Sequence, residues 1–152
     1  MTYNFIPVNL DRIVQTHTYT AIVLKSNDKR FAIFCEASVG RFLQMHLGAL
    51  ERVRPQSPDL LSMVLNSCDI TLKQVLINDL QDTTFYARLF LETQIPFPHG
   101  GKKPELHEKH LLLPHIIELD ARPSDCIIQA FLHNAPIFCT KEVVSKAVPF
   151  VE

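Results

Sequence analysis

The first third of the chain predicts strands followed by a helix. Apolar and polar residues alternate over 5–14, which favours an opening strand, and Pro7 predicts that this strand lies toward a sheet edge. The β-forming runs 19–26 and 31–37 flank the turn residues NDKR and predict a hairpin. The stretch 38–53 has helical spacing, with a predicted apolar face made of Val39, Phe42, Leu43, His46, Leu47 and Leu50.

A second helix has a clear start signal. Ser57 is a predicted N-cap, Pro58 suits the first helical position, and Asp59 complements the positive end of the helix dipole. The spacing of the following residues predicts a buried face made of Leu60, Leu61, Val64, Leu65 and Cys68.

The segments 70–79 and 84–92 predict two strands around the polar turn 80–83. Both faces of the second strand are partly apolar, so we expect it to be central and covered on two sides. Arg88 lies on this strand, and an isolated buried charge is costly. We therefore expect Asp79, Asp120 or a bound anion to be its partner.

Residues 93–115 predict a long loop excursion, because proline, glycine, lysine and histidine concentrate there. Its histidines match no zinc template, which favours a solvated loop over a metal site. Its lysines also leave contact with an anionic partner open. These residues are His99, His107, His110 and His115, with Lys102, Lys103 and Lys109.

The last segments predict strand, helix, strand and helix over 116–120, 124–134, 135–140 and 141–148. Strands and helices do not alternate regularly, and hairpins are present. The pattern therefore predicts an α+β fold: a single domain over 1–152, with a mixed, largely antiparallel sheet and helices packed on it.

Composition narrows the function only slightly. The chain has 152 residues, 47% hydrophobic and 20% charged, which is enough apolar material for one core. The formal net charge of −1 lacks the basic excess of a dedicated nucleic-acid binder, although a local basic patch stays open.

Cysteine placement and the N-terminal sequence favour a cytoplasmic protein with no membrane partner. The four cysteines form no C-x-x-C pair and lie in or beside apolar runs, as expected of buried thiols in a reducing compartment. The N-terminal residues lack the pattern of a signal peptide, and no apolar run reaches the ~20 residues that span a bilayer.

The stretch IIELDARPSDCIIQAF places charged residues between two apolar runs, and two interpretations stay open. In one, Ser124 caps a helix, Asp125 complements its dipole and Arg122 folds back on Asp120. In the other, the junction is a site. Its arginines, Arg122 and Arg88, clamp a phosphate beside the N–H groups near Ser124, and carboxylates hold Mg²⁺. The candidate carboxylates are Asp79, Asp82, Asp120 and Asp125.

Two runs, VLINDLQDTTFYARLFLE and IIELDARPSDCIIQAFLHNAPIFCTKEVV, resemble the bifunctional nuclease (BFN) domain family over about residues 20–147. The resemblance implies an α+β fold, a homodimer and a nuclease acting on RNA and DNA. The candidate catalytic residues are Asp79, Asp82, Arg88, Asp120, Arg122 and Asp125, with Ser124 binding a cofactor or anion and Asp79, Asp120 and Asp125 binding Mg²⁺ or Mn²⁺. The matching positions also include Phe85, Tyr86 and Pro123.

The chain departs from the family pattern at three positions. Pro58 stands where the family has a histidine, Glu36 is displaced from the usual glutamate position, and Thr83 replaces the hairpin glycine. These changes affect catalysis more than the fold. Two functions therefore stay open: a metal-dependent nuclease, and a non-catalytic dimeric binding or regulatory module. A third possibility is that the polar junction lies in the dimer interface.

Overall fold

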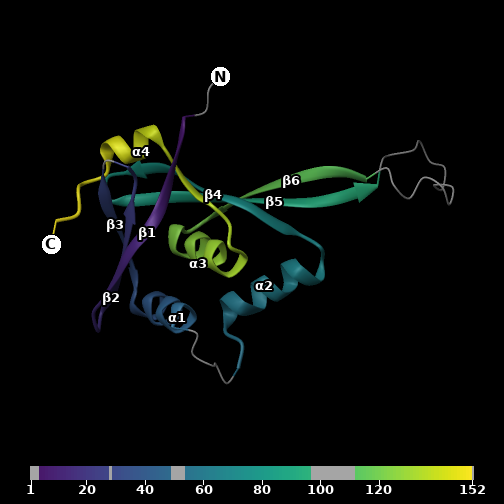
Figure 1. The fold of residues 1–152 in the computed structure, drawn as a ribbon, viewed down its shortest axis with the longest axis horizontal. Coiled ribbons are helices and arrows are strands. Elements are labelled where there is room, and N and C mark those ends of the chain that lie inside the picture. The colour runs from purple at the N-terminus through teal and green to yellow at the C-terminus, as the bar shows by residue number, and fades with distance from the viewer. Residues whose placement is uncertain (1–3, 28, 49–53, 97–111, 152) are drawn as a thin grey trace.

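A computed structural model describes residues 4–27, 29–48, 54–96 and 112–151 (Figure 1). Its strands form one sheet in the order β3-β2-β1-β7-β4-β5-β6. The strands are β1 (Phe5–Gln15), β2 (Tyr19–Lys25), β3 (Arg30–Glu36), β4 (Thr71–Gln81), β5 (Thr84–Pro96), β6 (Leu112–Ala121) and β7 (Ile137–Thr140). The helices are α1 (Ala37–Leu47), α2 (Ser57–Ser67), α3 (Pro123–His133) and α4 (Lys141–Lys146).

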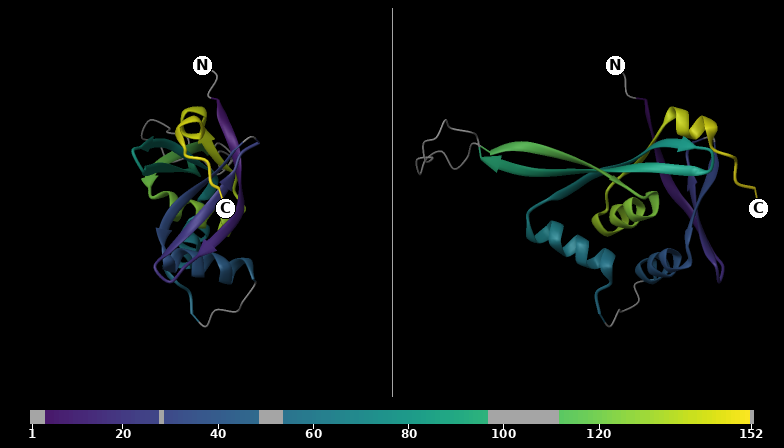
Figure 2. Two further views of the ribbon diagram at one scale, coloured as in Figure 1. Left: turned by 90° about the vertical axis from the view of Figure 1, so that its left-hand side faces the viewer. Right: turned by 180° about the vertical axis from the view of Figure 1, so that it is seen from behind.

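The sheet is mixed and largely antiparallel, which confirms the predicted α+β class. Only the pairing of β4 with β7 is parallel among the strand pairs of the described chain. The strands β1–β3 run across the direction of β4–β6, and α1, α2 and α3 lie on one side of β4–β6 while α4 lies on the other (Figures 1 and 2). In the part of the chain that is described, no helix is both long enough and apolar enough to cross a membrane.

The core fills the space between this sheet and the helices. Its largest fully buried side chains are Phe31, Ile22, Leu24, Leu43, Ile77 and Ile127. The stacked rings of Phe31 and Phe85, with centroids 5.8 Å apart, join β3 to the start of β5. This contact brings the edge strand β3 close to the β4–β5 turn, where the candidate site lies.

The position predicted for β1 at a sheet edge was wrong. The strand pairs with both β2 and β7, but its two halves have different partners. Pro7 lies opposite Phe138 in the half that pairs with β7 and not with β2. Proline is tolerated there, because that half of the strand has a neighbour on one side only and its other side requires no N–H donor.

The predicted excursion at 93–115 was too long. Both of its flanks are strand, because β5 continues to Pro96 and β6 begins at Leu112. The resulting β5–β6 hairpin projects beyond the rest of the molecule (Figure 1). His115 is an exposed residue of β6, whereas the other predicted loop histidines and lysines lie outside the described residues.

Two predicted helix caps were displaced by one or two positions. Gln56, not Ser57, is the N-cap of α2: its side chain accepts from the backbone of Asp59, and the Asp59 carboxylate accepts from the Gln56 backbone at 2.8 Å. Arg122, not Ser124, is the N-cap of α3, and Pro123 and Ser124 follow in the first turn.

The predicted buried face of α2 was also largely wrong. Leu65 is buried, but Leu60, Leu61, Val64 and Cys68 are exposed. Helical spacing identified an apolar face correctly, but only its Leu65 edge packs into the core. On α1, Val39, Phe42 and Leu43 are buried as predicted, while His46 is half-buried and Leu47 is exposed. The last predicted member, Leu50, is outside the described residues.

The strand β5 is central, as predicted, but its two faces are covered unequally. Ala87, Leu89 and Leu91 are buried, whereas on the other face Arg88 and Phe90 are half-buried and Tyr86 is exposed. The partner predicted for Arg88 was wrong: its Nε lies 3.4 Å from Glu118 on β6. Because both side chains are partly exposed, Arg88 needs no buried counter-ion or bound anion.

Candidate functional site

The candidate site is built around Arg122, the residue at which α3 begins. Its Nε and Nη2 donate to both carboxylate oxygens of Asp125, at 2.8 and 3.1 Å. Its Nη1 donates to Oε1 of Glu36 at 2.9 Å. Glu36 is itself the N-cap residue of α1, so this contact joins the first turns of two helices. The predicted folding of Arg122 onto Asp120 was therefore wrong.

The local sequence explains why Arg122 takes this geometry. Pro123 favours extended backbone at the preceding residue, and Arg122 has φ −63° and ψ 143°. Asp125 then falls one turn into the helix, where its carboxylate complements the dipole and can meet the guanidinium in a bidentate pair. The hydrogen bonds that Arg122 donates to Asp125 and then to Glu36 raise the pKa of Arg122, so its side chain is charged at any physiological pH.

All three side chains are open to solvent, with 60% of Arg122, 66% of Glu36 and 46% of Asp125 exposed. Exposed ion pairs contribute at most about 1 kcal/mol each to stability. The arrangement is therefore accessible to an incoming ligand, and its loss would leave most of the folding free energy intact.

A hollow of about 320 Å³ lies beside Arg122. It is enclosed by the C-terminal half of β3, the β4–β5 turn and the first turn of α3. Phe34, Thr83 and Ser124 line it together with Arg122 and Glu36. Ser124 is near the start of α3, where backbone N–H groups have no partner within the helix and can bind an anion.

A second hollow, of about 370 Å³, lies between α2, the β5–β6 pair and α3. Asp120 and Asp125 line it, along with Gln129 of α3. Both carboxylates also affect the neighbouring thiol of Cys126. Burial is the main cause that raises the pKa of this thiol to about 12, and the negative charges of Asp125 and Asp120 raise it further. Asp125 thus connects the second hollow to Arg122.

The other predicted site residues lie elsewhere. The Asp79 carboxylate accepts from the Leu80 backbone at 2.8 Å and from the Gln81 side chain at 2.9 Å. Asp82 occupies the β4–β5 turn with φ 55°, a conformation that aspartate tolerates better than threonine. Thr83 therefore does not need the positive φ that the missing glycine suggested. Arg88 lies on β5 against Glu118, as described above.

Of the three aspartates predicted to bind a metal, Asp120 and Asp125 line the same hollow, whereas Asp79 accepts from the Leu80 backbone. Within the described ranges, no group of three or more histidine, cysteine, aspartate or glutamate side chains could hold an ion. Amide oxygens are also ligands for Mg²⁺ or Ca²⁺, however. Gln129 donates from Nε2 to the Pro58 carbonyl at 3.1 Å, and its buried Oε1 has no partner among the described residues. Asp120, Asp125 and Gln129 thus line one hollow and carry oxygen atoms of the kind that Mg²⁺ binds.

Sequence reasoning missed two residues of the site. Glu36 was recognised only as a displaced glutamate, and its contact with Arg122 depends on a pairing across the whole fold. Gln129 falls on the apolar side of a helix, among Ile127, Ile128 and Ala130. A polar residue on a buried helix face is a signal, because such groups require a hydrogen-bond partner or a ligand.

Comparison with known proteins identifies the family of the chain. A family model described as "Bifunctional nuclease domain" matches residues 22–152. The chain belongs to the bifunctional nuclease domain family.

Two relatives from Mycobacterium tuberculosis are similar over nearly the whole chain. They are "Uncharacterized protein MT1877" of strain CDC 1551 / Oshkosh and "Uncharacterized protein Rv1829" of strain ATCC 25618 / H37Rv. Each is 25% identical over 138 residues, which cover 90% of this chain and 71% of the relative.

Proposed function

We propose that this protein is a metal-dependent nuclease that hydrolyses phosphodiester bonds of RNA or DNA at the Glu36–Arg122–Asp125 cluster. The family assignment supports this proposal, and the observation that carries it is the solvent-open guanidinium of Arg122, fixed by two carboxylates beside two hollows. Catalysis of phosphoryl chemistry depends chiefly on positioned positive charge, and Arg122 would supply it once a phosphate has displaced one carboxylate partner.

In this proposal Arg122 binds the scissile phosphate. A planar guanidinium can donate two parallel hydrogen bonds to phosphate oxygens, so the phosphate would replace one carboxylate partner of Arg122. Glu36 is the more exposed of these partners, and once released it can accept a proton from the attacking water. Asp125 keeps the guanidinium oriented, because it holds both Nε and Nη2.

Asp120, Asp125 and Gln129 would hold a Mg²⁺ or Mn²⁺ ion in the second hollow. Mg²⁺ is usually bound by one or two carboxylates together with waters and substrate phosphates, which suits this small donor set. When bound, such an ion polarises the phosphodiester and lowers the pKa of bound water. We expect Asp79, Asp82 and Arg88, predicted as site residues, to be less important than these groups.

The test is cleavage of single-stranded RNA and DNA in the presence of Mg²⁺ or Mn²⁺. Wild type should cleave, while Asp120→Asn and Arg122→Ala should lose activity. A loss of about 100- to 1,000-fold is expected for Arg122→Ala, as for removal of one group that stabilises transition-state charge. Absence of cleavage, or equal cleavage by the variants, would overturn the proposal.

One observation favours the alternative of a non-catalytic binding module. Arg122 is already neutralised by two carboxylates, so a substrate phosphate has to compete with them. Thermal-shift measurements with nucleotides, phosphate and divalent metals separate the two functions. A metal-specific stabilisation that disappears in Asp120→Asn supports the nuclease, whereas stabilisation by nucleotide or phosphate alone supports the module.

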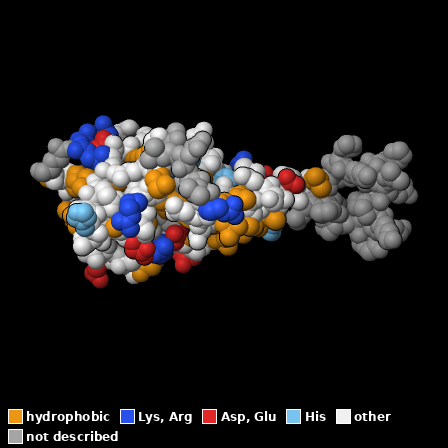
Figure 3. All heavy atoms as spheres, turned by 90° about the horizontal axis from the view of Figure 1, so that it is seen from below, with side chains coloured by type: hydrophobic (Ala, Val, Ile, Leu, Met, Phe, Trp, Pro, Cys, Tyr) orange, Lys and Arg blue, Asp and Glu red, His pale blue; other side chains and the backbone are white. Residues whose placement is uncertain are grey.

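The protein is further proposed to form a homodimer through the exposed apolar face of α2 and the adjoining end of β6. Figure 3 shows hydrophobic side chains gathered on the face of the molecule that carries α2. Its exposed members are Leu60, Leu61, Met63, Val64 and Leu119. Exposed apolar patches commonly mark interaction sites, and a two-fold dimer covers the same patch on both subunits.

A further inference from the structure

An exposed aromatic pair lies next to the candidate site, on the outward face of the β2–β3 hairpin. The side chains of Tyr19 and Phe34 are 41% and 65% exposed, and their ring centroids are 5.7 Å apart. Tyr19 is the cross-strand partner of Glu36, and Phe34 lines the same hollow as Arg122. The rings are therefore contiguous with the cluster proposed to bind a phosphate.

The fold makes little use of these two rings. The other face of the hairpin supplies the core through Ile22, Leu24 and Phe31, each fully buried. A cross-strand aromatic contact adds modestly to hairpin stability, but it does not require a ring as exposed as Phe34. Aromatic side chains beside a cationic groove are typical of surfaces that bind single-stranded nucleic acid by stacking its bases.

The opposite end of the same hairpin carries positive charge. Lys25 and Arg30 are directly opposite each other in the β2–β3 register, an arrangement that is unfavourable unless an anion compensates it. Arg30 lies 3.5 Å from Asp11, but that carboxylate also pairs with Arg12 at 3.3 Å. Among the described residues, Asp11 is thus shared by Arg12 and Arg30, and Lys25 adds a further positive charge.

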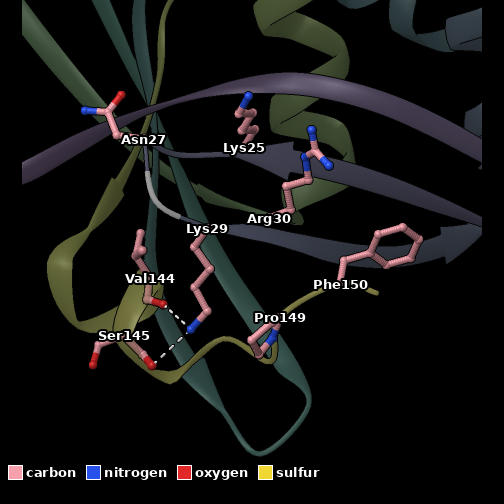
Figure 4. A pocket seen from close by; sticks show the side chains of 8 residues that line it. All are labelled: Lys25, Asn27, Lys29, Arg30, Val144, Ser145, Pro149 and Phe150. Atoms are coloured by element: carbon pink, nitrogen blue, oxygen red, sulfur yellow. Dashed lines mark hydrogen bonds between the residues drawn. The ribbon is translucent and has the colours of Figure 1, made fainter. Parts of the chain in front are cut away.

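These cations border a hollow of about 660 Å³ between the β2–β3 turn, α4 and the C-terminal segment (Figure 4). Lys29 is engaged with the end of α4, because its Nζ donates to the carbonyls of Val144 and Ser145 at 2.8 and 3.2 Å. Lys25 and Arg30 also line the hollow, and Phe150 provides an aromatic ring at its edge.

The aromatic pair and the cations lie on one face of the hairpin. Residues alternate between faces along a strand, so Arg30 and Phe34 project to the same side of β3. Four residues of strand separate them by roughly 13 Å. The positions between them carry the short side chains Ala21, Val23 and Ala32. Ala21 and Val23 are buried, so a strand that joins the two ends has to pass over the groups that cover them.

We propose that this face of the β2–β3 hairpin binds single-stranded nucleic acid, with bases stacked on Phe34 and Tyr19 and a backbone phosphate held by Lys25 and Arg30. This inference rests on the proposed function, because the strand bound on the hairpin would be the substrate that is cleaved at Arg122. It assigns the substrate class: a single strand with unpaired bases, in preference to a duplex.

Binding is measured in EDTA by the fluorescence anisotropy of labelled single strands of about 12 nucleotides, within the site sizes that such surfaces cover. Phe34→Ala should weaken binding by about 5- to 150-fold, the loss of one stacked base. Phe34→Tyr should restore affinity, and Leu47→Ala, which removes an exposed apolar side chain from α1, should leave it unchanged.

Salt dependence tests the cationic end separately. Lys25→Ala and Arg30→Ala should each reduce the slope of log affinity against log salt by about one, whereas Phe34→Ala should leave the slope unchanged. A matched duplex should bind more weakly than the single strand. Circular dichroism of each variant checks that it is folded.

The two proposals can fail separately. If the protein binds tightly in EDTA and Phe34→Ala weakens this binding, but no cleavage occurs when metal is added, the nuclease proposal is rejected and the binding face is supported. If cleavage occurs but wild type and Phe34→Ala have equal affinity, the binding face is rejected and the nuclease proposal is supported. Failure of the wild type to bind any single strand, or equal binding of single strand and duplex, overturns the inference.

Discussion

Glu36 and Arg122 are 86 positions apart in the sequence, yet their side chains meet at 2.9 Å and connect the first turns of α1 and α3. The contact places the carboxylate of Glu36, at the end of the β2–β3 hairpin, beside the family motif that contains Arg122. It also distinguishes the two arginines of the motif, because Arg88 lies against Glu118 instead.

Replacing Arg122 with lysine should separate charge from geometry. Lysine keeps the positive charge but cannot donate two parallel hydrogen bonds, so we expect phosphodiester cleavage to fall by about 100-fold. The free energy of unfolding should change by less than about 1 kcal/mol, because the pairs are exposed. Kinetics and urea denaturation measure the two effects. A lysine variant with wild-type turnover would show that the bidentate geometry is irrelevant.

Removing the amide oxygen of Gln129 should weaken metal binding. In Gln129→Leu the buried Oε1, which has no partner among the described residues, is lost, so we expect the affinity for Mn²⁺ to fall by about tenfold or more. Isothermal titration calorimetry measures this directly, independent of activity. Asn78→Leu is a matched control, because it also removes a buried unpartnered oxygen, but from β4. Equal Mn²⁺ affinity in wild type and Gln129→Leu would exclude Gln129 as a ligand.

Buried thiols should make the protein less stable at alkaline pH. Burial raises the pKa of Cys126 and of Cys139 to about 12, from an ordinary thiol value of 9.0. Between these values the unfolded chain releases thiol protons that the folded chain retains, so the free energy of unfolding falls as pH rises from about 9 toward 12. Urea denaturation across this range measures the slope.

The matched variant for this effect is Cys139→Ala, which should show a shallower alkaline decline than wild type by up to about 1.4 kcal/mol per pH unit. At neutral pH the exposed Cys68 should react with a thiol reagent first. Identical alkaline slopes in wild type and Cys139→Ala would contradict the assigned pKa of this thiol.

Charge on the exposed face of α2 should dissociate the dimer. Leu60→Glu and Val64→Glu place carboxylates in the proposed interface, and the monomer should stay folded because both residues are already about half exposed. Light scattering should report a dimer for wild type and a monomer for these variants. Arg122→Glu should stay dimeric. A dimer lost only in Arg122→Glu would move the interface to the polar junction.

The sequence predicted the strands and helices well because their periodicities are local properties. It also identified the region around Arg122, since Pro123 and Asp125 define a helix start by their own chemistry. It could not predict which carboxylates meet there. Asp79 and Asp120 both lie near the C-terminal ends of their strands, β4 and β6. Their contacts differ, however, because the Asp79 carboxylate accepts from Leu80 and Gln81, whereas Asp120 lines the second hollow.

The errors in burial have a related cause. An apolar face on α2 is visible in the sequence, but whether it packs inward or forms a surface depends on where α2 rests against α3. Leu65 reaches the core while Leu60 does not. The same pattern of spacing is consistent with a core face and with an interface, so burial within one chain could not be read from it.

The most direct test of the nuclease is single-turnover cleavage of a labelled single-stranded oligonucleotide with Mg²⁺, comparing wild type, Arg122→Ala, Glu36→Gln and Lys73→Ala. Lys73 is the control, because its pair with Glu92 at 3.2 Å is a surface contact on β4. Wild type and Lys73→Ala should cleave the oligonucleotide, with losses of about 100-fold or more in the other two variants. Equal rates in all four proteins would contradict a nuclease site at Arg122 and Glu36.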